Sequence, residues 1–203
     1  AKAFFQIGKY EKSLKSIQDA KKIQNENLEL ALLEGNVYFN LVNNDKALRI
    51  ASDILSFNPE FEKAYLLMIS VYQRKNKYQE ALKTADQGLE LCKNNIALKM
   101  AKATILRLLN RETDALQLVS QITNAAPSNF QALSLLAHLY IDLDDISAAE
   151  ITPKKSLRIT QDQPEVQLLL GKILSKQGNL DQALEYLSKS AALAPEDVEP
   201  CLE

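Results

Sequence analysis

The chain repeats a pattern every 34 residues. One register of this repeat is always alanine, with no insertion or deletion between the five positions: Ala47, Ala81, Ala115, Ala149 and Ala183. A second register holds mostly small side chains: Gly35, Ile69, Ala103, Ala137 and Gly171. A strict period of about 20 to 50 residues is typical of chains in which one supersecondary unit recurs and buries its apolar face against its neighbours. The sequence therefore predicts a stack of short units.

Further residues at fixed positions give the repeat the pattern of a known family. Gly35-Asn-Val-Tyr38 is followed by Ala47 and Pro59, and Gly171 is followed by Gly178-Asn-Leu-Asp-Gln-Ala183 and Pro195. These small, aromatic, alanine and proline positions resemble those of the tetratricopeptide repeat (TPR) family over the whole chain. The resemblance implies an all-α fold, a right-handed α-solenoid (superhelix) built from helix–turn–helix units.

The period divides residues 1–203 into a single array. Complete units are expected at residues 28–61, 62–95, 96–129, 130–163 and 164–197, with partial units at 1–27 and 198–203. Because both partial units are cut within the period, we expect the sequence to be a fragment of a longer array. First helices are predicted at 28–41, 62–75, 96–109, 130–143 and 164–177, and second helices at 45–57, 79–91, 112–125, 146–159 and 180–193. Candidate caps for second helices are Asn44 or Asp45, Asp144 or Asp145, and Asn179.

Three residues depart from the pattern. Glu34 and Lys102 occupy a register that is usually apolar in the family, so their charges must reach solvent or their helices must rotate. Pro153 falls about eight residues into a predicted second helix, where proline removes a hydrogen bond and clashes with the preceding turn. We therefore expect a kink or break near Glu150–Pro153.

The composition limits the classes of partner and compartment. A net charge of −2 favours neither nucleic acid nor an anionic membrane, and no apolar run is long enough to cross a bilayer. Cys92 and Cys201 lie far apart in sequence and form neither a disulfide framework nor a metal-binding spacing. This cysteine usage favours a reducing compartment, and we expect a cytoplasmic location.

Catalytic chemistry has little support in the sequence. His138 is the only histidine, and Asp142 lies one helical turn later, but no nucleophile or third metal ligand accompanies them. Asp142, Asp144 and Asp145 lack the glycine and the closing glutamate of a calcium loop, so helix capping explains them better. We predict no catalytic, cofactor-binding or metal-binding residues, and a protein that is not an enzyme.

A binding surface is the better expectation. First helices of a TPR array line a concave groove, and residues at three- and four-residue spacing on them face inward. Projecting this spacing predicts an apolar line of Leu32, Leu66, Met100 and Leu168 with basic neighbours. The residues predicted to contact a partner, hereafter the groove residues, are Lys63, Leu66, Ser70, Arg74, Met100, Thr104, Arg107, His138, Asp142 and Lys172.

The predicted function is therefore a scaffold or adaptor that binds a peptide or protein segment with apolar anchors and acidic side chains. A chaperone-tail clamp is excluded, because leucine or alanine stands where the clamp needs its middle asparagine: Leu33, Leu67, Ala101, Leu135 and Leu169. One alternative is the recognition or regulatory arm of a larger enzyme, such as a glycosyltransferase, or of an envelope protein for secretion, pilus assembly or polysaccharide export. Another is self-association through the ends of the array.

Overall fold

The computed structural model describes residues 1–23, 27–159 and 161–193. These residues form twelve α-helices and no strand, and 81% of them are helical. The chain divides into two compact units, unit 1 (Ala1–Leu109) and unit 2 (Asn110–Glu203). The all-α prediction is confirmed.

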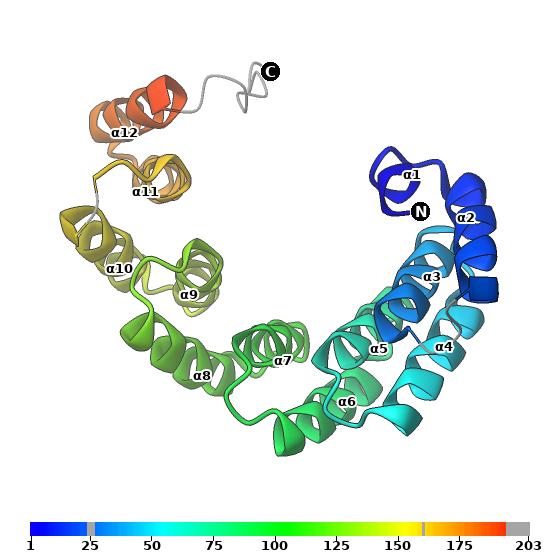
Figure 1. Ribbon diagram of the computed structural model, residues 1–203. Helices are drawn as coiled ribbons and strands as arrows, with labels where there is room; N and C mark the ends of the chain where they lie inside the picture. Colours follow the sequence, from blue (N-terminus) through cyan, green and yellow to red (C-terminus); the bar gives the residue numbers. More distant parts are fainter. Residues whose placement is uncertain (24–26, 160, 194–203) are drawn as a thin grey trace. The chain divides into compact units, whose positions relative to one another are not determined.

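Unit 1 consists of seven helices that pack in sequence order. They are α1 (Lys2–Gln6), α2 (Tyr10–Ile23), α3 (Leu28–Asn40), α4 (Asn44–Phe57), α5 (Glu62–Arg74), α6 (Tyr78–Leu91) and α7 (Ile96–Leu108). The first helices α3, α5 and α7 lie in one layer and contact one another, while α4 and α6 form the second layer (Figure 1). The first helices of unit 1 therefore share one face.

Unit 2 repeats this arrangement with five helices. They are α8 (Glu112–Ala125), α9 (Phe130–Asp142), α10 (Ile146–Ile159), α11 (Pro164–Lys176) and α12 (Leu180–Leu193). The first helices α9 and α11 contact each other, and α10 packs against both. In both units every predicted helix of a complete repeat begins and ends within one residue of its expected position.

The repeated small side chains form the core of both units. All five repeat alanines are buried, at 0–3% exposure, and Ser13 takes the same register in α2 and is also buried. The second small register is buried as well, from Gly35 to Gly171. A Cβ added to Gly171 would lie 2.7 Å from Leu187 Cγ and 3.2 Å from the Ala183 carbonyl oxygen. The two registers therefore meet where the helices of one hairpin come closest.

Asparagine caps begin several first helices. Asn27, Asn95 and Asn129 occupy one register, and the side-chain oxygen of each accepts a hydrogen bond from the backbone N–H three residues later, at 2.9–3.0 Å. The sequence analysis missed this register. Among second helices, Asp145 caps α10 as predicted, whereas α4 is capped by Asn43 rather than by Asn44 or Asp45. The cap lies one residue earlier because α4 itself begins at Asn44.

The turn between the two helices of a hairpin always contains a residue with positive φ. This register holds Gly8, Val42, Asn76, Asn110, Asp144 and Gly178, with φ between 54° and 79°. Glycine, asparagine and aspartate tolerate this left-handed conformation, whereas a β-branched side chain is strained in it. Val42 is therefore the one mismatch in an otherwise well-matched register.

Ion pairs accommodate the charged residues that stand at apolar positions. Glu34 of α3 pairs with Lys21 of α2, and the Lys102 Nζ of α7 lies 2.7 Å from the Asp86 Oδ1 of α6. Both pairs are partly exposed, and each joins a first helix to the preceding second helix. The helices thus keep their register, because the charges are neutralised at the edge of the packed interface.

The prediction of a helix break at Pro153 is wrong. Helix α10 runs without interruption from Ile146 to Ile159, and the Pro153 ring is buried in the register of a large apolar side chain. The ring supplies apolar contact at this position, which offsets the missing hydrogen bond.

A polar contact joins this part of α10 to the next hairpin. The Glu150 carboxylate pairs with Lys154 one turn later and accepts a 2.9 Å hydrogen bond from Gln177 Nε2. Leu48, Leu82 and Leu116 occupy the same register in other second helices, so the carboxylate stands where the repeat usually places leucine. The bonds from Lys154 and Gln177 lower the pKa of Glu150 from its ordinary value of 4.5.

No helix within residues 1–23, 27–159 and 161–193 is long and apolar enough to cross a membrane.

The turn register predicts that Val42→Asn stabilises the protein by about 1 kcal/mol, because asparagine relieves the strain of a β-branched residue at positive φ. Val42 is 68% exposed, so little buried area is lost. Urea unfolding measures the change. The reverse substitution at the equivalent turn, Asn76→Val, is the control and should destabilise by a similar amount. A lower free energy of unfolding for Val42→Asn would show that the valine makes a needed contact.

The lowered pKa of Glu150 predicts a pH-dependent contribution to stability. A group whose pKa is lower in the folded state stabilises it above the unfolded pKa, and that stabilisation is lost as the pH falls through the folded pKa. Glu150→Gln should therefore cost about 1 kcal/mol at neutral pH and nothing once the wild-type carboxylate is protonated. Urea unfolding between about pH 7 and pH 3 measures this convergence.

The matched control is Glu185→Gln, which removes an exposed pair with Lys189 at the same four-residue spacing in α12. Exposed pairs of this kind contribute little to stability, so the loss of stability for Glu185→Gln should be smaller. A pH-independent cost for Glu150→Gln would contradict the assignment.

Candidate functional site

The candidate site in unit 1 is the shared face of α3, α5 and α7. Two contacts join side chains about one period apart on this face. Lys63 Nζ donates a 2.7 Å hydrogen bond to Glu29 Oε1, which lies 34 residues earlier. The Arg74 guanidinium lies 3.4 Å from the centre of the Phe39 ring, 35 residues earlier. Side chains of α3 and α5 therefore touch across this face.

Lys63 is exposed but already has a carboxylate partner. The hydrogen bond that Lys63 donates to Glu29 raises the pKa of Lys63. Glu29 does not belong to the ten groove residues. Its place one period before Lys63 on the adjacent first helix brings the two opposite charges together. An acidic partner must compete with Glu29 for Lys63.

Arg74 connects α5 to the end of α3. Its guanidinium stacks on Phe39 and donates to the Phe39 carbonyl oxygen in the last turn of α3. A cation at a helix C-terminus interacts favourably with the unpaired carbonyls and with the helix dipole. Arg74 therefore holds α5 against α3 and is also a candidate contact for a partner. Phe39 shares the structural role.

The two hydroxyl groups of the face bond to their own helices. Ser70 Oγ donates to the Leu66 carbonyl at 2.8 Å, and Thr104 Oγ1 donates to the Met100 carbonyl at 3.0 Å. Since each hydroxyl hydrogen is used, these side chains can only accept a hydrogen bond from a partner.

The apolar line is shorter than predicted. Leu66 and Met100 are half-buried on the face, but Leu32 is 7% exposed and packs in the core with Ala51 and Leu67. Leu32 is thus a core residue, because α4 and α5 close over it. Leu108, at the end of α7, is 44% exposed and adds apolar surface beyond the predicted line.

In unit 2 the three remaining groove residues lie on α9 and α11. The His138, Asp142 and Lys172 side chains are all exposed, and Arg107 of unit 1 is half-buried. Leu168 of α11, the last member of the predicted apolar line, is also exposed. Within the part of the chain that the structure describes, no three His, Cys, Asp or Glu side chains are placed to hold a metal ion.

Solved structures of repeat proteins resemble the chain along most of its length. A tetratricopeptide repeat protein from Parabacteroides merdae superposes with a TM-score of 0.70 at 18% identity, covering 96% of this chain and 76% of that one. Pseudomonas aeruginosa pilF gives 0.68 at 19% identity, covering 83% and 77%. YrrB, described as a TPR protein with an unusual peptide-binding site, gives 0.57 at 18% identity, covering 89% and 93%. At these identities the likeness shows the fold.

Comparison with family models assigns the chain to a family, which the structural likeness does not. A tetratricopeptide repeat model matches residues 164–197, and the model of the ChAPs, the Chs5p-Arf1p-binding proteins, matches residues 1–156. Comparison with curated protein sequences gave no match. The ChAPs match spans well over half of the sequence. The chain, a TPR protein, therefore belongs to the family of Chs5p-Arf1p-binding proteins.

Proposed function

We propose that this chain is a protein-interaction scaffold that binds a segment of a partner protein on the α3–α5–α7 face of unit 1. The observation that carries the proposal is the pair of contacts between first helices, Lys63 with Glu29 and Arg74 with Phe39. They hold α5 against α3 before a partner arrives. A rigid, prearranged face loses little conformational freedom on binding.

The chemistry of the face favours a segment with apolar anchors. Leu66, Met100 and Leu108 present partly exposed apolar surface. Burial of such surface supplies about 25 cal/mol for each Å² removed from water. Polar groups that already bond within the chain, such as Ser70 and Lys63, then set the position of the segment and contribute less to affinity. The exposed side chains of α9 and α11 in unit 2, His138, Asp142 and Lys172, are a further proposed contact surface.

The family description supplies the first partners to test. The family is named for binding Chs5p and Arf1p, so we propose a protein of one of these two kinds as the occupant of the face. The family match supports a binding scaffold over the arm of an enzyme. A cytoplasmic location belongs to the same proposal, because Cys92 is a free thiol.

The proposal predicts that charge changes on the face weaken partner binding. The double variant Glu29→Lys with Lys63→Glu keeps the internal ion pair but reverses the charge pattern that a partner meets. This variant and Arg107→Glu should each weaken binding of Chs5p or Arf1p at least tenfold, about 1.4 kcal/mol. Isothermal titration calorimetry with each purified partner measures the affinities.

The control is Lys83→Glu, an exposed change on the second helix α6 that makes the same charge change as Arg107→Glu. It should alter affinity less than about twofold. Equal losses for all three variants, or a loss for Lys83→Glu alone, would place the interaction elsewhere on the protein and contradict the proposal.

A further inference from the structure

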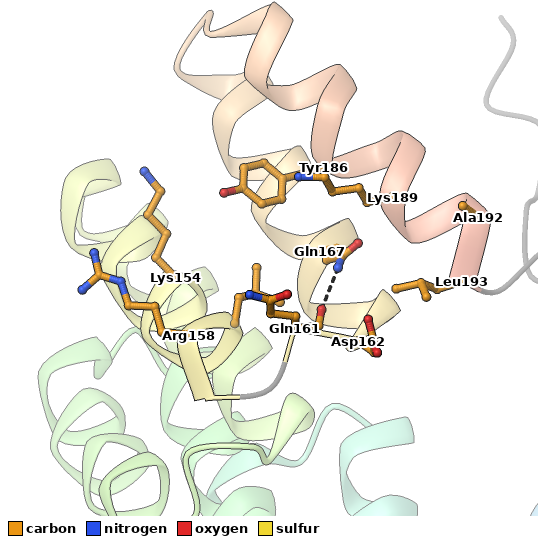
Figure 2. Close-up of a pocket in the computed structure, with 10 residues that line it drawn as sticks. Lys154, Arg158, Gln161, Asp162, Gln167, Tyr186, Lys189, Ala192 and Leu193 are labelled. Carbon is orange, nitrogen blue, oxygen red and sulfur yellow. Dashed lines mark hydrogen bonds between the residues drawn. The ribbon is translucent and has the colours of Figure 1, made fainter.

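Unit 2 contains a cavity that none of the groove residues line. It lies between α10, α11 and α12 and has a volume of about 730 Å³ (Figure 2). Arg158 and Lys154 reach it from α10, Gln167 from α11, and Tyr186 and Lys189 from α12. Ligand pockets in proteins usually have volumes of about 300–1,000 Å³. The cavity is therefore large enough for a few residues of a peptide.

A buried amide in this cavity lacks a partner for its oxygen. Gln167 is 6% exposed, and its Nε2 donates a 2.8 Å hydrogen bond to the Gln161 carbonyl oxygen. Its Oε1 is buried and has no hydrogen-bond partner. A buried acceptor left unpaired destabilises the protein, so a ligand that brings an N–H or O–H group to this oxygen removes that penalty.

One cation of the lining is available to a ligand. The Lys154 ammonium is held by Glu150, and Lys189 pairs with Glu185 and lies 5.4 Å from the centre of the Tyr186 ring. Arg158 is exposed, and within residues 1–23, 27–159 and 161–193 nothing forms an ion pair or hydrogen bond with its guanidinium. A guanidinium recognises a carboxylate through two parallel hydrogen bonds.

The rest of the lining is largely apolar. Leu157 of α10 and Leu193 of α12 line the cavity, together with the half-buried Tyr186 ring. Asp162 is the acidic side chain of the lining. Because Glu150 and Glu185 already neutralise Lys154 and Lys189, Arg158 is the cation of the lining that attracts an anionic group of a ligand. A free inorganic anion would satisfy Arg158 but would leave both the apolar walls and the Gln167 oxygen without partners.

We propose that this cavity is a second binding site, for a short acidic peptide segment that carries an apolar side chain. A glutamate or aspartate of the segment pairs with Arg158, and a backbone N–H donates to Gln167 Oε1. The apolar side chain packs against Leu157 and Leu193. This site is independent of the proposed face on α3, α5 and α7, because its lining residues all lie in α10, α11, α12 and the segment between α10 and α11.

The test starts with a library of random heptapeptides displayed on phage and selected against the whole 203-residue protein. Selection on wild type, after depletion on Arg158→Glu, should enrich peptides that combine acidic and apolar residues. The affinity of the best synthetic peptide is then measured by fluorescence polarisation. Arg158→Glu should weaken it at least tenfold, and the control Lys155→Glu, an exposed neighbour outside the lining, less than twofold.

Backbone methylation isolates the contact with Gln167. The same peptide with N-methylated backbone amides should bind wild type at least fivefold more weakly, whereas Gln167→Met, which removes the acceptor at similar volume, should bind both peptides about equally. Three results would overturn the proposal. They are enrichment of peptides without acidic residues, equal losses of affinity for Arg158→Glu and Lys155→Glu, and equal effects of methylation on the affinity of wild type and of Gln167→Met. Competition by inorganic phosphate at the same concentration as the peptide would reassign the cavity to anions and overturn it as well. None of these results depends on whether the α3–α5–α7 face binds Chs5p or Arf1p.

Discussion

The close approach of two helices at small side chains is the constraint on which the rest of the structure depends. In the last hairpin, a Cβ on Gly171 would come within 3.2 Å of the Ala183 carbonyl oxygen, so there is no room for a larger side chain without movement. The alanine register is fully or almost fully buried in every repeat that has it. Because interiors are close-packed, small buried side chains at the same registers of each repeat fix how the helices pack within each unit.

This repeated crossing explains why so much of the fold could be predicted. Helix bounds follow from the period, since the small residues mark where helices cross and the turn residues mark where they end. Contacts outside the period could not be found in this way. Lys21 with Glu34 and Asp86 with Lys102 are separated by 13 and 16 residues, so no shared spacing links them. The expected break at Pro153 was wrong because local propensity was weighed without the tertiary packing that holds α10 together.

The candidate site, like the fold, could be predicted from the sequence only in part. In unit 1 the first helices contact one another, and Lys63, Leu66 and Met100, which were predicted to contact a partner, belong to these helices. Spacing alone could not show which side chains already have partners. Lys63 pairs with Glu29, Arg74 stacks on Phe39, and Ser70 bonds to a carbonyl of its own helix. Nor could it reveal the cavity around Gln167, which depends on three helices and on one amide oxygen without a partner. The repeat thus predicts which helices share a face, whereas contacts outside the repeat pattern, such as those around Gln167, could be found only in the structure.

The most direct test of this account is the free energy of unfolding of Ala81→Leu compared with Ala97→Leu. Ala81 is fully buried in the repeat register on α6, whereas Ala97 is exposed in the first turn of α7. If the small register sets the crossing, Ala81→Leu should destabilise the protein by about 1–3 kcal/mol or more in guanidinium unfolding, and Ala97→Leu should change it by less than about 0.5 kcal/mol. Equal effects of the two substitutions, or a gain in stability for Ala81→Leu, would contradict the claim that this close approach determines the fold.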